Sequence, residues 1–153
     1  METTFKGDVA ELMAASELVE RGYIVSRPLT NGAAYDLLVD LDGRILRIQV
    51  KRSCRQSNGT LRINLYTSKY HRGRSRIGYD GKVDFILGVD CDNREFYLIG
   101  GDQLKRTAIH LRATPSLNNQ VVGCRPATEF LLDRVFPKRL VGAAGFEPAA
   151  SAV

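Results

Sequence analysis

Apolar and polar residues alternate most regularly between residues 36 and 52 of the chain. Successive side chains of a β-strand point to opposite faces, so this period of two predicts a pair of strands, each with one apolar face. The dipeptide Asp42-Gly43 separates the two runs and is a strong signal for a two-residue hairpin turn. Such a turn fixes the pairing of the strands, and it predicts that Leu37 faces Ile48.

The polar positions of the same hairpin bring three functional groups together. The register that pairs Leu37 with Ile48 also places Asp36 opposite Gln49, and facing residues have Cβ atoms about 5 Å apart. Lys51 follows Gln49 on the same strand face. An acid, an amide and a cation are therefore expected on one side of the hairpin, with aliphatic residues on the other.

A helix is predicted over residues 6–21, where apolar residues recur at helical spacing and Arg21-Gly22 supplies a stop signal. The recurring positions are Val9, Leu12, Met13, Ser16 and Val19. Glu11 lies off this stripe, and its neighbours at helical spacing are Ala14, Ala15 and Leu18. These small side chains would let another element approach the acid, although most helical glutamates lie on a solvated face. The helix alone favours the solvated position.

The rest of the chain is mainly strands. Further strands are predicted over residues 23–29, 60–66, 83–90, 95–99 and 107–111, a loop over 117–126 and a helix over 128–136. This order predicts a mixed α+β or α/β domain around one central sheet. Residues 1–140 are expected to form a single domain, and the Gly/Ala-rich residues 141–153 a flexible tail.

Residues 67–82 carry most of the net charge of +5, because five basic side chains stand there against the single acid Asp80. The basic residues are Lys69, Arg72, Arg74, Arg76 and Lys82, and Tyr66 and Tyr70 stand nearby. Charge runs are usually solvated loops. Here the glycines, the tyrosines and the scarcity of acids favour a loop or hairpin that contacts DNA, with arginines at base edges and lysines at phosphates.

Composition excludes several classes of protein. The chain has 153 residues with 44% hydrophobic and 25% charged residues, as an ordinary globular domain has. No apolar run approaches the roughly 20 residues of a membrane span, and no signal peptide is visible. The three cysteines are far apart and odd in number, which favours reduced thiols over a disulfide framework or a zinc site. A cytoplasmic protein without a membrane partner is expected.

The polar cluster offers metal-dependent chemistry. The chain lacks a phosphate-binding glycine loop, a nucleophile elbow and a His-Glu-x-x-His motif, and it has only two histidines. Asp36 is a good Mg²⁺ ligand, Gln49 is a weaker oxygen donor, and Lys51 is suited to stabilise charge in a transition state. A simple surface ion pair between Asp36 and Lys51 explains the same residues, and spacing alone does not decide between the two interpretations.

An ordered set of short motifs resembles the PD-(D/E)XK nuclease superfamily, most closely its small group I intron-encoded homing endonucleases found in tRNA genes. The motifs cover about residues 5 to 100 and are Lys6-Gly7 with Glu11, Arg21-Gly22-Tyr23, Tyr35-Asp36-Leu37, Arg47-Ile48-Gln49-Val50-Lys51 and Val83-Asp84-Phe85. The resemblance implies the restriction-endonuclease-like core, a central mixed sheet flanked by helices.

The resemblance also implies roles for the residues. Asp36 would be the central metal-binding acid, Lys51 the catalytic lysine and Glu11 the helix acid that completes the metal site. Gln49 stands where the superfamily usually has Glu or Asp, and the intron-encoded members resemble this chain in having Gln there. Glu11, Asp36, Gln49 and Lys51 would thus be catalytic, and the first three would hold Mg²⁺, for which Mn²⁺ should substitute.

We therefore expect a Mg²⁺-dependent, site-specific endonuclease of double-stranded DNA that serves intron homing. One chain holds one site and cutting a duplex needs two, so a homo-oligomer, a dimer or tetramer, is expected. Two alternatives stay open: a Holliday-junction resolvase-like or repair nuclease of the same fold, and a non-catalytic DNA-binding protein on the nuclease scaffold. The Gln at position 49 is the best argument for the last.

The tail adds a hypothesis about the target. The codons of Gly145-Phe146-Glu147-Pro148 accommodate the T-arm sequence of a tRNA gene. A reading frame that runs from an intron into a tRNA exon would explain them, and a chance Ala/Gly-rich tail is the alternative. The first interpretation predicts that the target is a tRNA gene.

Overall fold

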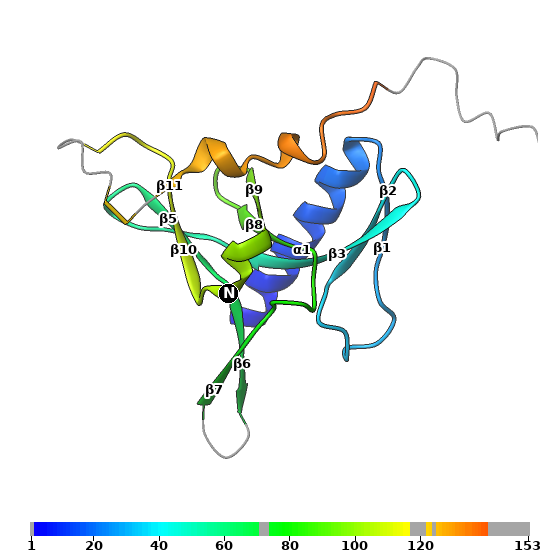
Figure 1. The fold of residues 1–153 in the computed structure, drawn as a ribbon, viewed down its shortest axis with the longest axis horizontal. Coiled ribbons are helices and arrows are strands. Elements are labelled where there is room, and N and C mark those ends of the chain that lie inside the picture. The colour runs from blue at the N-terminus through cyan, green and yellow to red at the C-terminus, as the bar shows by residue number, and fades with distance from the viewer. Residues whose placement is uncertain (1, 71–73, 117–121, 124, 141–153) are drawn as a thin grey trace, which may run out of the picture.

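The structure is a computed structural model that describes residues 2–70, 74–116, 122–123 and 125–140 (Figure 1). The chain begins with α1 (Thr3–Glu20), the α-helix of the described residues, and strands and 3₁₀ turns follow. The strands are β1 (Ile24–Ser26), β2 (Leu37–Leu41), β3 (Arg44–Arg52), β4 (Cys54–Arg55), β5 (Thr60–Asn64), β6 (Tyr66–Tyr70), β7 (Arg74–Gly78), β8 (Phe85–Asp90), β9 (Glu95–Gly100), β10 (Ala108–Arg112) and β11 (Arg125–Pro126). The 3₁₀ turns are η1 (Gly101–Lys105), η2 (Ala127–Phe130) and η3 (Leu132–Arg134).

The central sheet has the order β1-β2-β3-β8-β9. Its β3–β8 pair is parallel and its other pairs are antiparallel, so the sheet is mixed. The chain leaves β3 to build β4 to β7 before it returns at β8, as parallel neighbours require a long connection. The predicted fold class, a mixed α/β domain around one central sheet, is confirmed.

The predicted hairpin is confirmed in its register. Leu37 pairs with Ile48 and Val39 with Leu46 across β2 and β3. Asp42 and Gly43 form the turn with φ values of +54° and +89°, the left-handed pair that a type I′ turn needs. The Asp40 carboxylate accepts the Gly43 N–H at 2.7 Å and helps to hold this turn.

Helix α1 covers one face of the central sheet, but with a different side from the one that the sequence pattern indicated. Ala10, Ala14 and Leu18 are buried against the aliphatic residues of β2, β3 and β8. Of the predicted apolar stripe, Met13 packs at the edge of this core, whereas Leu12 and Val19 are exposed. The two small residues, Ala10 and Ala14, let the helix lie close to the sheet.

A second sheet of order β11-β10-β5-β4 packs against the other face of the central sheet. The two sheets meet closely at Gly88, where an added Cβ would lie 2.4 Å from the Ile63 Cδ1 atom. A larger residue at position 88 would therefore force the buried Ile63 side chain of β5 to shift.

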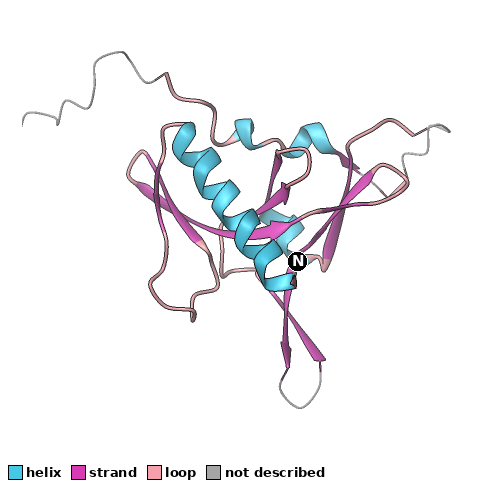
Figure 2. Ribbon diagram, turned by 180° about the vertical axis from the view of Figure 1, so that it is seen from behind, coloured by secondary structure: helices cyan, strands magenta, loops and turns pink. Residues whose placement is uncertain are grey.

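The basic segment forms a two-stranded hairpin of its own, β6–β7, in which Thr67 pairs with Ile77 and Ser68 with Arg76. Both ribbon views show this hairpin projecting away from the body of the protein (Figures 1 and 2). A hairpin or a loop was expected for the basic segment, and the structure shows a hairpin.

The predicted helix over residues 128–136 is wrong. The structure has the short turns η2 and η3 there, separated by Leu131, which is extended and bridges to Tyr97 of β9. The apolar residues whose spacing suggested a helix instead pack separately. Leu132 and Phe136 are both buried in the core under α1.

Residues 132–139 form a C-terminal strap that closes on the end of α1. The Arg21 guanidinium donates to Asp133 at 2.6 Å and to the Phe136 carbonyl at 2.8 Å. Tyr23 donates to the Pro137 carbonyl at 2.9 Å, and its ring meets the Phe136 ring edge-on with centroids 5.1 Å apart. The Arg139 guanidinium stacks over the Tyr23 ring, 4.1 Å from its centroid.

Smaller boundaries also differ from the sequence expectations. The predicted strand 23–29 is confined to β1, and the predicted strand 60–66 divides into β5 and the start of β6. Part of the predicted loop 117–126 forms β11, while residues 117–121 and 124 and the tail 141–153 lie outside the described residues. No helix in the described ranges is long and apolar enough to cross a membrane.

Candidate active site

The polar face of the hairpin forms a cavity of about 390 Å³. Asp36, Gln49 and Lys51 line it together, as the register predicted. Thr67, Ile77 and Gly78 at the foot of the β6–β7 hairpin also line it, together with Tyr79, Lys82 and residues 31–34. The acid, the amide and the lysine therefore open directly onto the base of the basic hairpin.

Asp36 is held by the backbone of the neighbouring strand. Its N–H donates to the Ile48 carbonyl at 2.9 Å, which extends the β2–β3 ladder by one residue. Its Oδ2 atom accepts the Val50 N–H at 2.8 Å and a second hydrogen bond from the Gln49 amide nitrogen. These donors fix the carboxylate, because both lie on or beside a strand of the central sheet.

Gln49 is buried, and its amide nitrogen points to Asp36. The carbonyl oxygen Oε1 is then the atom of this amide that is suited to ligate a cation. A Glu at this position would face Asp36 as a second carboxylate, whereas Gln49 adds a hydrogen bond and no charge.

Lys51 lies over an aromatic ring that sequence reasoning missed. Its Nζ atom is 5.0 Å from the centroid of Tyr79, whose side chain is buried. This is a cation–π distance, so the ring stabilises the ammonium group beside Asp36. Tyr79 follows β7 directly, and no local signal in the sequence links it to β3.

A second cavity of about 320 Å³ adjoins the first, and Asp36 lines both. Asp8 and Glu11 of α1 line its far side together with Arg27. Glu11 accepts a hydrogen bond from Arg27 at 2.7 Å, so an ion pair holds it at the edge of the site. The helix pattern alone favoured a solvated position for Glu11, and this prediction is wrong. Glu11 instead lies close to another element of the fold, which was the alternative.

Sequence reasoning missed Asp8 and Arg27. Asp8 stands three residues before Glu11, which places both acids on one side of α1 and is a signal that the sequence does contain. Arg27 comes from the segment after β1, and only the fold brings it to the helix.

Burial is the main influence on the pKa values of both site acids. Burial raises the pKa of Asp36 above its ordinary value, although the Val50 N–H and the charge of Lys51 oppose the rise. Burial and then the charge of Asp36 raise the pKa of Glu11, with Arg27 opposing. Two carboxylates with raised pKa values near one another are the electrostatic signature of a site suited to a cation.

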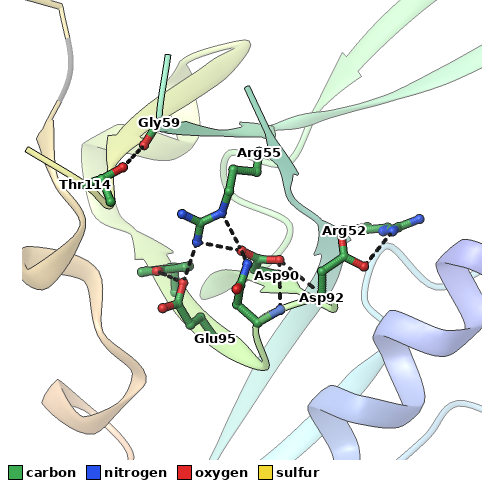
Figure 3. Close-up of polar contacts among 9 residues, drawn as sticks. Arg52, Arg55, Gly59, Asp90, Asp92, Glu95 and Thr114 are labelled. Carbon is green, nitrogen blue, oxygen red and sulfur yellow. Dashed lines mark hydrogen bonds and ion pairs between the residues drawn. The ribbon is translucent and has the colours of Figure 1, made fainter. Parts of the chain in front are cut away.

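A second group of acids near the β8–β9 turn has the opposite character (Figure 3). Arg55 donates to Asp90 at 2.9 Å and to Glu95 at 3.0 Å, and Arg52 lies 3.7 Å from Asp92. Although burial opposes it, hydrogen bonds from Asn93 and Arg55 hold the pKa of Asp90 below its ordinary value. These carboxylates already have their cations, and we assign them to structure.

The oxygen donors of the site fit a hard divalent cation. Among the described residues no group of three or more His, Cys, Asp or Glu side chains is placed to hold a metal. The candidate set here has two carboxylates, Asp36 and Glu11, with the amide of Gln49. Mg²⁺ usually takes only one or two protein carboxylates and keeps several waters, so this set is compatible with it.

The predicted DNA-binding residues are only partly described. Arg76 is exposed and stacks on the Tyr66 ring at 4.8 Å, and Lys82 donates to the Gly78 carbonyl at 3.2 Å. The backbones of Lys69, Tyr70 and Arg74 lie in β6 and β7. Arg72 lies outside the described residues. The predicted roles of all these residues in binding stay predictions.

Comparisons with known proteins agree with this geometry. A family model described as PD-(D/E)XK endonuclease matches residues 1–133. A search of curated proteins finds no match. Among solved structures, the chain is similar to a bacterial homing endonuclease, I-Ssp6803I, with a TM-score of 0.72 and 25% sequence identity over 86% of this chain and 89% of that chain. The family model spans α1 to β10, and thus all four candidate site residues.

Proposed function

Because the chain belongs to the PD-(D/E)XK endonuclease family, we propose that it is a Mg²⁺-dependent, site-specific endonuclease of double-stranded DNA that serves intron homing. The observation that carries the proposal is the cavity in which Asp36, Gln49 and Lys51 face the foot of the basic β6–β7 hairpin. A phosphate of DNA bound along the hairpin would enter the same cavity that holds the acid and the lysine.

Asp36 and Glu11 would hold the metal ion, with Gln49 Oε1 as a neutral third donor. When bound there, Mg²⁺ supplies charge stabilisation at the scissile phosphate and a water of lowered pKa. The raised pKa values of both acids support this role, since a divalent cation would offset the cost of burying their charges and the repulsion by Asp36 that further raises the pKa of Glu11.

Lys51 would stabilise the negative charge that develops on the phosphate. Tyr79 beneath it fixes the ammonium group near Asp36, so the charge is already in position before the substrate arrives. Gln49 would orient Asp36 through its amide hydrogen bond. Because Gln49 is neutral, the two carboxylates of Asp36 and Glu11 would balance the charge of a single divalent metal ion.

The β6–β7 hairpin would provide most of the contacts to DNA. Arg76 is an exposed cation in the middle of β7, and Lys82 is an exposed cation four residues beyond the end of that strand. Phosphate contacts of this kind make binding depend on salt, with a slope of about −0.9 in log K against log salt for each phosphate neutralised. If all five basic residues contact phosphates, the slope approaches about −4.5.

The homing function, the target and the oligomer are the finer parts of the proposal. The similarity to a bacterial homing endonuclease supports the first. The T-arm codons of the tail, which lies outside the described residues, support a tRNA gene as the target. One active site per chain supports a homo-oligomer with two-fold symmetry, because both strands of the duplex are to be cut.

One assay separates the proposal from its alternatives. The purified protein is incubated with a plasmid that carries an intact tRNA gene and with a four-way junction, each with Mg²⁺ or with EDTA. Linearisation at one locus, in Mg²⁺ only, is the expected result. Cutting of the junction alone would favour a resolvase-like enzyme. Binding of DNA without cutting, both in Mg²⁺ and in EDTA, would favour a non-catalytic DNA-binding protein.

A further inference from the structure

The outer face of α1 carries a stripe of apolar side chains that nothing in the described chain covers. Phe5 and Leu12 are each 61% exposed, Val19 57% and Val9 38%. Figure 2 shows α1 lying in front of the sheet with no described element over it. Isolated exposed apolar residues are ordinary, but a row of them along one helix marks an interaction surface.

The spacing of this outward stripe is that of a helix–helix seam. Positions 5, 9, 12, 16 and 19 alternate steps of four and three, the pattern by which one helix packs along another. At about 100° per residue the stripe lies opposite Ala10, Ala14 and Leu18, which are buried against the sheet. The helix therefore presents one apolar face inward and a second one outward.

We propose that the outward stripe of α1 pairs antiparallel with the same stripe of a second copy of this chain, about a two-fold axis at Leu12. Phe5 and Val19 lie seven positions to either side of Leu12, so Phe5 would meet Val19 of the second copy and the two Leu12 residues would meet on the axis. The need for two active sites, and for both to face one duplex, rests on the proposed function.

The charges beside the stripe favour this pairing. Lys6 and Glu20 lie on the same side of the stripe, both exposed, near opposite ends of α1. In the antiparallel pair, Lys6 of each copy comes within about 3 Å, measured along the axis, of the level of Glu20 of the other.

The two-fold axis also accounts for the position of the active site. Asp8 and Glu11 lie on the other side of the stripe from Lys6 and Glu20, and a two-fold axis through Leu12 keeps corresponding sides of the two helices on the same side of the dimer. Packed helices are about 8–10 Å apart, and Glu11 is next to the axis. Both active sites would therefore open toward one face, where a single duplex can reach them.

Light scattering after gel filtration tests the proposal on the full chain, without DNA or metal. We expect a mass of twice 17.0 kDa or a higher even multiple, which Leu12→Lys should halve, weakening the association at least 100-fold. Ile24→Lys is the matched control, because Ile24 is 67% exposed on the sheet face away from α1. Circular dichroism and thermal unfolding check that both variants are folded.

Charge reversal tests the antiparallel arrangement. Lys6→Glu and Glu20→Lys should each weaken association about tenfold, and the double variant should restore it, since the pairs between copies are re-formed with exchanged signs. A monomeric wild type, an unchanged mass for Leu12→Lys, or a double variant as weak as the singles would overturn the proposal. A wild-type dimer that cuts no DNA would overturn the proposed function and leave this interface intact.

Discussion

Replacing Asp36 with Asn should stabilise the protein while abolishing cleavage. Burial raises the pKa of Asp36, so the folded state holds its proton more tightly than the unfolded chain does. The stability that this proton provides is present below the ordinary pKa of Asp and is lost as pH rises through the folded pKa. At pH 8 the charged carboxylate costs about 1.4 kcal/mol for each unit by which its pKa is raised, and Asn removes this cost.

The size of the effect depends on the two donors that Asp36 accepts. The Val50 N–H at 2.8 Å and the Gln49 amide both point at Oδ2. An Asn carbonyl can accept these bonds, whereas Asp36→Ala leaves the donors unpaired at about 1–3 kcal/mol each. We therefore expect the free energy of unfolding of Asp36→Asn to exceed that of Asp36→Ala by about 2 kcal/mol. This difference corresponds to roughly 4–8 °C in Tm for a chain of this length.

Thermal and urea unfolding between pH 5 and pH 8, with and without Mg²⁺, measure these differences. The stability of the wild type should fall with rising pH relative to that of Asp36→Asn. Mg²⁺ at ten times its Kd should stabilise the wild type by about 1.4 kcal/mol and leave Asp36→Asn unchanged. An Asp36→Asn variant that is less stable than the wild type at pH 8, or that responds equally to Mg²⁺, would refute the argument.

Three further outcomes follow from contacts described above. Lys51→Met should lower single-turnover cleavage about 100-fold or more, because it removes the charge and keeps the stem, while the Kd for DNA in Ca²⁺ changes little; undiminished cleavage would exclude Lys51 from the chemistry. Arg76→Ala should reduce the salt slope of DNA binding by about 0.9 if Arg76 contacts a phosphate, as a filter-binding titration measures, and an unchanged slope would contradict that contact. Gly88→Ala should cost about 1–3 kcal/mol in urea unfolding, because its Cβ meets Ile63. The double variant with Ile63→Val should recover part of that loss, and full additivity would argue against the clash.

The parts of the site that sequence predicted are those fixed by local geometry. A two-residue turn determines the register of β2 and β3, and the register alone puts Asp36 beside Gln49 and Lys51. Arg27 and Tyr79 escaped prediction because they reach the site from other parts of the fold. Their contacts with Glu11 and Lys51 depend on where the β1 exit and the hairpin exit pack, which no local pattern encodes.

Helix α1 shows a second limit of sequence patterns. The helical period was predicted correctly. However, when a helix has two apolar sides, the sequence pattern does not determine which of them faces the sheet. Ala10 and Ala14 let the helix lie close to the sheet and Leu18 packs beside them, while Leu12 and Val19 on the opposite side are left outside. At the C-terminus, Leu131 extends to bridge Tyr97, and this tertiary contact overrides the helical spacing around it.

The C-terminal strap has a consequence for how the protein is made. Phe136 is fully buried beneath α1, and Arg21 holds both Asp133 and the Phe136 carbonyl, so residues near the two ends of the described chain complete one core. A chain still being synthesised has α1 and the hairpin long before it has the strap. We expect the nascent protein to remain incompletely packed until residue 139 is released, which delays the assembled nuclease until translation of its fold is finished. Truncation before Leu132 should accordingly yield a chain that is sensitive to proteolysis.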